Sequence, residues 1–237
     1  MPRANHPAAA AARRVGRRAA QPLPRARCAL VLVDVINPLD FDGAEALAPS
    51  ALRAAPHIAA LKRGLAARGV PALYVNDNFG HWHADFDRLI ARCRAGRAAA
   101  ARLAQQLAPG RGDITLVKPR HSGFYATPLQ LLLTQMGTHE LVVAGFATDL
   151  CVLLTAADAY ERGHRLWVPA DCCAAQSAAR HDAALQWLHE TLRACTTAAW
   201  PAAVSGDAST AASTRAPARR GMPFAERRQA PPPDPRK

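Results

Sequence analysis

The sequence predicts an α/β fold in which a mostly parallel sheet is covered by helices on both faces. Short apolar runs alternate along the chain with longer stretches of helical periodicity, which is the pattern of right-handed βαβ units. The first apolar run, residues 29–35 (ALVLVDV), shows no alternation with polar residues. Strands buried on both faces of a parallel sheet have this composition.

The first helix is predicted over residues 44–68. Leucine and isoleucine recur there at nearly helical spacing, and Gly69 ends the helix as a C-terminal glycine does. Pro49 and Pro56 lie within this stretch, and proline removes a backbone donor. We therefore expect the beginning of the helix to be broken.

The remaining elements continue the alternation. Further strands are predicted at residues 72–76, 114–118, 141–144 and 165–168, with a weakly indicated sixth strand near 195–199. Further helices are predicted at residues 85–107, in two pieces around Gly96, and at 128–136, 149–162 and 177–194. Thr127 and Pro128 have the residue types of a cap and a first helical position.

Charge divides the chain into three parts. The net charge is +12, but residues 1–27 hold seven arginines and no acid, whereas residues 28–200 hold 16 basic and 15 acidic residues. We predict a basic disordered leader at 1–27, a folded domain at 28–204 and a disordered basic tail, rich in proline and alanine, at 205–237. A nearly neutral domain argues against nucleic acid as a partner, although the arginine-rich ends leave that alternative open.

Cysteine usage predicts a cytoplasmic protein. Six cysteines form no CxxC motif, and the chain is longer than domains that depend on disulfides. The neighbouring pair Cys172 and Cys173 is interpreted as two small buried residues rather than as a redox sensor. No apolar run approaches the roughly 20 residues that span a bilayer, so no membrane partner is expected.

Reactive side chains follow the ends of the predicted strands. Asp34 closes the first strand, Asn76 and Asp77 the second, and Lys118 the third, while Cys151 lies in the turn after the fourth. Ligands of open parallel sheets bind at the carboxyl ends of the strands. The sequence therefore predicts that an acid, a base and a thiol meet at one edge.

Cys151 is the candidate nucleophile. In the first turn of a helix, a thiol is shifted toward thiolate, and the free backbone amides there can hold an oxyanion. The alternative is a buried cysteine that serves as a small apolar residue. Asp34 would accept the thiol proton, and Lys118 would hold both neighbours in charged form. Alternatively, Asp34 and Lys118 form a purely structural pair.

Three segments resemble a known family. LVLVD, VKPRHSGFYATPL and LVVAGFATDLCVLLTAADAYERG resemble the signature segments of the isochorismatase-like cysteine hydrolases, which include nicotinamidases and N-carbamoylsarcosine amidases. The resemblance covers about residues 28–200. It implies a three-layer α/β/α sandwich of Rossmann-like topology, with Asp34, Lys118 and Cys151 as the catalytic triad. It also implies a cis peptide between Phe146 and Ala147, which aims the amides of Ala147 and Cys151 at the substrate as an oxyanion hole.

The resemblance implies hydrolysis of a C–N bond in a small amide, ureido or carbamoyl compound through a thioester, without a cofactor. It also implies a homo-oligomer, a dimer or a tetramer. The alternative is a catalytically inactive member that binds a small molecule or a protein partner.

Two departures from the family pattern bear on the pocket. The expected Asp-x-Gln-Asn is Asp34-Val35-Ile36-Asn37 here, and Asp77, His81 and His83 do not have the metal-binding spacing of nicotinamidases. We therefore expect a polar loop facing the substrate, and no metal. Pocket candidates, each of which could equally be packing residues, are Asn37, Phe41, Asn76, Trp82, Phe124 and Phe146. His121 is interpreted as a surface or rim residue.

Overall fold

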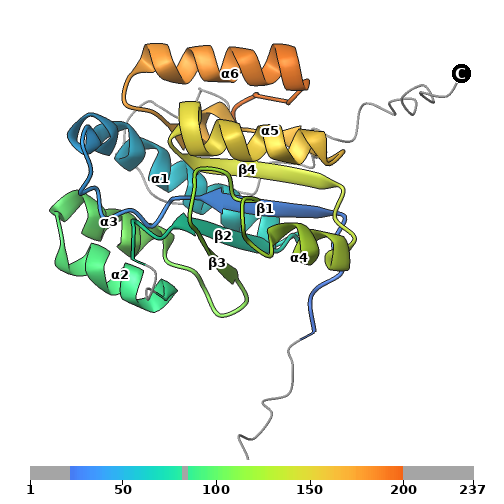
Figure 1. Ribbon diagram of the computed structural model, residues 1–237, viewed down its shortest axis with the longest axis horizontal. Helices are drawn as coiled ribbons and strands as arrows, with labels where there is room; N and C mark the ends of the chain where they lie inside the picture. The colour runs from blue at the N-terminus through green and yellow to red at the C-terminus, as the bar shows by residue number, and fades with distance from the viewer. Residues whose placement is uncertain (1–21, 82–84, 200–237) are drawn as a thin grey trace, which may run out of the picture.

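A parallel sheet forms the centre of the protein. The computed structural model describes residues 22–81 and 85–199. The sheet has the strand order β3-β2-β1-β4-β5, with a short strand β6 also paired to β4, and all pairings in it are parallel. The strands are β1 (Cys28–Val33), β2 (Ala72–Asp77), β3 (Ile114–Lys118), β4 (Glu140–Phe146), β5 (Arg165–Trp167) and β6 (Cys173–Ala174). Figure 1 shows β4, β1, β2 and β3 following one another from top to bottom.

Helices cover both faces of this sheet. They are α1 (Ala44–Ala66), α2 (Phe86–Ala95), α3 (Ala98–Leu107), α4 (Leu129–Met136), α5 (Leu153–Glu161) and α6 (Ala178–Leu192). Alternate residues of β1 point to opposite faces: Leu30 and Leu32 pack with α1, α2 and α3, whereas Val31 and Val33 pack with α4, α5 and α6. The predicted three-layer α/β/α sandwich is therefore confirmed.

Helix α1 is continuous, so the prediction of a broken beginning is wrong. Pro49 and Pro56 lie inside it and are both exposed. An interior proline costs about 3 kcal/mol, but the carbonyls left without partners can bind water on the solvent side. The opposite side buries Leu47, Ile58 and Leu61, and each such side chain contributes about 1.5–3 kcal/mol. Burial of that stripe outweighs the lost backbone bonds.

The sixth strand lies at a different place in the chain from the one predicted. Near residue 195 the structure contains only an isolated bridge between Cys195 and Trp167. β5 has three residues, so it offers little ladder for a further strand. The strand β6 lies earlier in the chain and pairs with the end of β4.

The turn after β4 differs from a simple helix start. A π-helical turn, η1 (Thr148–Val152), precedes α5, and a 3₁₀ turn, η2 (Ala170–Cys172), precedes β6. Gly145 has φ 132°, and a Cβ atom at this position would lie 2.0 Å from the carbonyl oxygen of Val33. A glycine is therefore required for β4 to approach β1 here, beside Asp34.

The structure leaves several predictions untested. Residues 1–21 of the predicted leader, and the entire predicted tail, lie outside the described residues. None of the helices within 22–81 and 85–199 combines the length and the apolar composition that a bilayer-crossing segment needs.

Candidate active site

Asp34 lies directly after β1, buried at the carboxyl edge of the sheet. Its backbone has φ 53°, a left-handed conformation that aspartate tolerates better than most residues. Its amide donates to the Val75 carbonyl, and its Oδ1 accepts a hydrogen bond from the Asp77 amide at 2.6 Å. With only 4% of the residue exposed, the carboxylate is held in one orientation by neighbouring backbone.

Lys118, the last residue of β3, is completely buried. Its Nζ lies 2.9 Å from Asp34 Oδ2 and 3.5 Å from Asp77 Oδ2. β3 is two strands away from β1, so the long side chain crosses the end of β2 to reach Asp34. Two carboxylates therefore compensate the charge of a lysine that has no contact with solvent.

Cys151 lies in η1, with 8% of the residue exposed. Its Sγ is 3.7 Å from Lys118 Nζ and 3.7 Å from His121 Nδ1. The Asp34 carboxylate, which pairs with the same Lys118 Nζ, acts on this thiol through its negative charge. The structure thus brings together the three residues that the sequence placed at the ends of β1, β3 and β4.

The electrostatics of the group favour a protonated thiol. Burial and the Asp34 carboxylate raise the pKa of Cys151, against the opposing effect of Lys118. Burial also raises the pKa of Asp34, again opposed by Lys118. Burial lowers the pKa of Lys118, but Asp34 and Cys151 raise it by more than burial lowers it. The pKa therefore lies above its usual value, and the side chain is an ammonium group. The expectation of a thiol shifted toward thiolate at rest is wrong, because the sulfur is buried beside a carboxylate.

The turn that carries Cys151 is ordered by its own backbone. The Phe146–Ala147 peptide is cis. The Ala147 carbonyl accepts hydrogen bonds from the amides of Leu150 and Val152, at 3.2 and 3.1 Å. The role of the Ala147 and Cys151 amides as an oxyanion hole stays a prediction.

The polar pocket candidates hold the loop after β1. Asn76 is fully buried, and its Nδ2 donates to the Ile36 carbonyl at 2.7 Å. Its Oδ1 is buried with no hydrogen-bond partner among the described residues. The Oδ1 of Asn37 accepts from the Leu39 amide. Both side chains therefore fix the backbone of the loop after β1.

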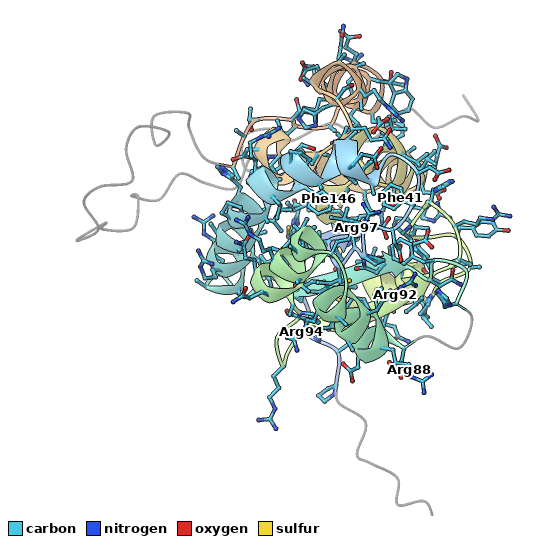
Figure 2. The ribbon with its side chains drawn as sticks, turned by 90° about the vertical axis from the view of Figure 1, so that its left-hand side faces the viewer. Phe41, Arg88, Arg92, Arg94, Arg97 and Phe146 are labelled. Atoms are coloured by element: carbon cyan, nitrogen blue, oxygen red, sulfur yellow. The ribbon has the colours of Figure 1, made fainter. Side chains whose placement is uncertain are left out.

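The aromatic candidates fall into different environments. Phe41 is 38% exposed, on the side of the molecule that Figure 2 faces, and the neighbouring Asp40 forms an ion pair with Arg92 of α2. Phe146 and Phe124 are buried in the two hydrophobic core clusters, contacts that favour the packing alternative. Trp82 lies outside the described residues.

Two residues of the site make contacts that the sequence did not predict. Asp77 was predicted at the end of the second strand and was weighed there as a metal ligand, but its carboxylate faces Lys118. His121 was interpreted as a rim residue, and it is exposed, but it contacts the Cys151 sulfur. Its position three residues after Lys118 was the available signal. Within the described residues, no three or more His, Cys, Asp or Glu side chains group as metal ligands, while His83 lies outside them.

Comparison with known proteins agrees with this geometry. The family model described as the isochorismatase domain matches residues 28–199. An uncharacterized isochorismatase family protein of Bacillus subtilis, YaaI, is 36% identical over 170 residues, which cover 72% of this chain and 93% of that protein. The ureidoacrylate amidohydrolase RutB of Methylorubrum extorquens is 50% identical over 60 residues, covering 25% of this chain and 24% of the relative.

Solved structures share the fold. N-carbamoylsarcosine amidase from Thermoplasma acidophilum superposes with a TM-score of 0.56 at 27% identity, covering 73% of this chain and 96% of that one. A nicotinamidase from Staphylococcus aureus superposes with a TM-score of 0.57 at 20% identity, covering 72% and 97%. The family match spans the whole described sheet together with Asp34, Lys118 and Cys151. This chain therefore belongs to the isochorismatase domain family.

Proposed function

We propose that this chain is a cysteine hydrolase that cleaves the C–N bond of a small amide, ureido or carbamoyl compound. The observation that carries the proposal is the meeting of Asp34, Lys118 and Cys151, from three strand ends, in one buried group. A carboxylate close to a thiol, beside a fixed ammonium group, can remove the thiol proton as the sulfur attacks, which is how a cysteine that rests protonated becomes a nucleophile.

The first half of the reaction forms a thioester. Asp34 takes the proton from the Cys151 thiol as the sulfur attacks the carbonyl carbon, so that the free thiolate never accumulates in water. The carbonyl oxygen gains negative charge, which the amides of Ala147 and Cys151 accept by hydrogen bonding. Asp34 then gives the proton to the substrate nitrogen, the C–N bond breaks, and ammonia or an amine leaves.

The second half hydrolyses the thioester. Water attacks the acyl carbon while Asp34 takes one of its protons. The C–S bond breaks, the acid product leaves, and the sulfur recovers the proton from Asp34. Lys118 stays an ammonium group throughout. It stabilises the negative charge on Asp34 or on the Cys151 sulfur, whichever carries it at a given step.

The names of the relatives support the class of substrate. RutB is a ureidoacrylate amidohydrolase, and the structure from Thermoplasma acidophilum is an N-carbamoylsarcosine amidase, so both are named for amide-type C–N bonds. The sequence match to RutB covers a quarter of either chain, which supports the bond type more than the individual compound.

The test is ammonia release from a panel of primary amides, ureido acids and carbamoyl compounds. We expect turnover of at least one class by the wild-type protein, and none by Cys151→Ala or Asp34→Asn. Circular dichroism should show that Cys151→Ala is folded. Near wild-type turnover by either variant would refute the mechanism, and a wild-type protein that binds panel compounds without turnover would favour an inactive binding protein.

We also propose a cytoplasmic homo-oligomer. All six cysteines are free, which suits a reducing compartment. Light scattering of the full chain tests the assembly, since a dimer or tetramer is expected and a monomer at micromolar concentration would contradict it.

A further inference from the structure

The first turn of α6 contacts the turn that carries Cys151. Thr148 Oγ1 lies 2.8 Å from His181 Nδ1, and Asp149 Oδ2 lies 2.5 Å from Arg180 Nε. Ser177 caps this end of α6 by accepting from the Arg180 amide. Two consecutive residues of α6 therefore hold two consecutive residues of η1, although about thirty positions separate them in the chain.

Thr148 is well placed to transmit such a contact. It is fully buried and directly follows Ala147, one of the two proposed oxyanion donors. The Ala147 carbonyl is already fixed by the Leu150 and Val152 amides. Anchoring the Thr148 hydroxyl fixes the other end of the same peptide unit, so the orientation of the Ala147 backbone depends on both contacts.

The His181 ring has partners on both sides. Burial lowers the pKa of His181, against a hydrogen bond with the Ala170 backbone and the charges of Asp182 and Asp149, which raise it. The Thr148 hydroxyl can donate or accept, and so can the ring nitrogen according to its tautomer, so either atom can be the donor across the 2.8 Å contact.

We propose that His181 is a positioning residue that acts through Thr148 to hold the Ala147 and Cys151 amides toward the substrate oxygen. The inference rests on the proposed function, because His181 can have this role only if the protein is a hydrolase that stabilises an oxyanion. His181 touches neither the reacting atoms nor the substrate, and its effect is on the geometry of η1. A misplacement of about 1 Å in such a group can cost on the order of a hundredfold in rate.

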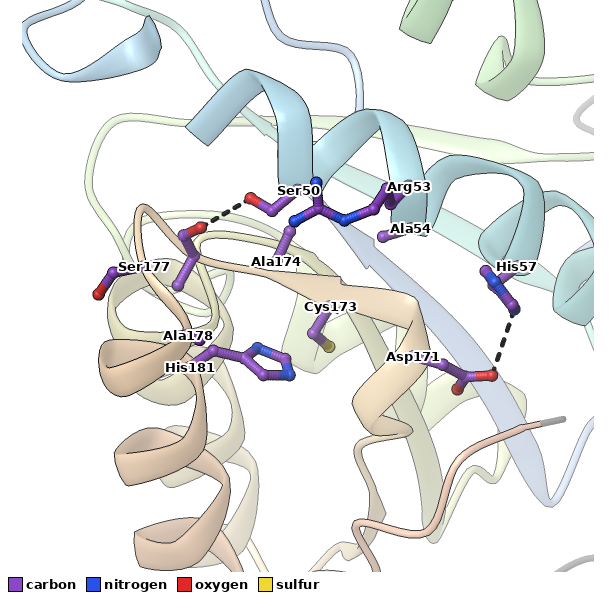
Figure 3. Close-up of a pocket in the computed structure, with 11 residues that line it drawn as sticks. Ser50, Arg53, Ala54, His57, Asp171, Cys173, Ala174, Ser177, Ala178 and His181 are labelled. Atoms are coloured by element: carbon purple, nitrogen blue, oxygen red, sulfur yellow. Dashed lines mark hydrogen bonds and ion pairs between the residues drawn. The ribbon is translucent and has the colours of Figure 1, made fainter. Parts of the chain in front are cut away.

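A cavity beside His181 makes the proposal sharply testable. The cavity has a volume of about 300 Å³ and lies between α1, the η2–β6 segment and α6, with Arg53, His57 and Asp171 also lining it. Figure 3 shows the His181 ring extending from α6 toward Cys173. Truncation of His181 to alanine would connect the vacated space with this cavity, so that imidazole from the solvent can occupy it.

The experiment compares His181→Ala, His181→Asn and Thr148→Val by steady-state kinetics on a compound that the wild-type protein hydrolyses. We expect His181→Ala to lower kcat about 10- to 100-fold with little change in KM, since oxyanion contacts act in the transition state. The asparagine amide can donate or accept near the place of Nδ1 and should retain most of kcat. Imidazole added to His181→Ala should restore part of the loss.

Thr148→Val removes only the hydroxyl, so it should reproduce the kcat loss, and the double variant should be no slower than either single variant. His57→Ala alters the same cavity from α1 and should leave kcat unchanged. Wild-type kcat in His181→Ala, or additive losses in the double variant, would overturn the proposal. If His181→Ala does not fold, the kcat values of His181→Asn and Thr148→Val are compared with that of the wild type instead.

Alkylation separates this inference from the proposed function. If the wild-type protein hydrolyses no compound of the panel, the proposed function fails on that result alone. The rate at which iodoacetamide labels Cys151 then tests the positioning, because η1 also sets the orientation of the sulfur. Equal labelling rates in the wild type, His181→Ala and Thr148→Val would overturn it, whereas a shared and non-additive change supports it.

Discussion

The Lys118 ammonium group lies 2.9 Å from the Asp34 carboxylate, with 0% and 5% of the two side chains exposed. Both charges have lost their hydration, so each depends on the other. Removing one partner of such a buried pair leaves an uncompensated charge, whereas removing both does not. The pair is therefore as much a requirement of the fold as of the proposed chemistry.

Lys118→Met should lower the free energy of unfolding by about 3–5 kcal/mol, the usual cost of leaving a buried charge unpaired. Urea unfolding at pH 7.5 measures this loss in the free energy of unfolding, provided that the variant and the wild type have the same m-value. Arg92→Met is the matched control, because the Arg92–Asp40 pair is 39% and 37% exposed and such a pair contributes about 0–1 kcal/mol. The double variant Lys118→Met with Asp34→Asn should recover part of the loss. Equal midpoints for Lys118→Met and Arg92→Met would contradict the buried pair.

Asp34→Asn should make the thiol easier to ionise while abolishing turnover. The Asp34 carboxylate raises the pKa of Cys151, and Lys118 lowers it. The amide removes the first effect and keeps the second, so the pH profile of iodoacetamide labelling should move to lower pH. Mass spectrometry of the labelled peptide follows Cys151 alone. A profile that moves to higher pH, or does not move, would show that Asp34 does not hold the thiol proton.

Much of the site could be predicted because strand ends are visible in sequence. Asp34 directly follows one predicted strand and Lys118 ends another, so their place at one edge of a parallel sheet follows from topology. The predicted position of Cys151, in the turn after the fourth strand, also agrees with its place in η1. The strands β1 to β5 were all located, with boundaries within two residues.

The remaining features depend on contacts that periodicity does not contain. A single π-helical turn at η1 has nearly the same side-chain pattern as an α-helical turn, and the two residues of β6 are too few to show a period. The protonation of Cys151 depends on burial and on its distance from Asp34. The contact between Thr148 and His181 joins segments whose spacing the sequence does not specify.

His164 should make the protein less stable in mild acid. It is buried, neither ring nitrogen has a hydrogen-bond partner among the described residues, and burial lowers its pKa. A histidine with a lowered pKa in the folded state contributes its full stability above about pH 6.5, the unfolded value, and loses it as the pH falls through the folded value. His164→Phe, which keeps a ring against Phe124, should flatten the difference between urea midpoints at pH 7.5 and 5.5. An unchanged difference would assign the acid sensitivity to other groups.

Gly145→Ala should disrupt the junction between β1 and β4. The new Cβ would lie 2.0 Å from the Val33 carbonyl oxygen, which is backbone and cannot rotate away, and φ is 132°. The strands must separate, so we expect a loss of several kcal/mol in the free energy of unfolding, above the usual range of about 0.5–3 kcal/mol for point substitutions.

Gly64→Ala is the control for that substitution. Gly64 lies inside α1, and a Cβ there meets nothing within 4 Å, so alanine should stabilise the helix by about 0.5–1 kcal/mol. Because Val33 precedes Asp34 and Gly145 lies six residues before Cys151, any Gly145→Ala protein that still folds should also lose hydrolysis. A folded Gly145→Ala protein with wild-type stability and wild-type kcat would show that the close approach of the two strands is not what places the thiol beside the carboxylate.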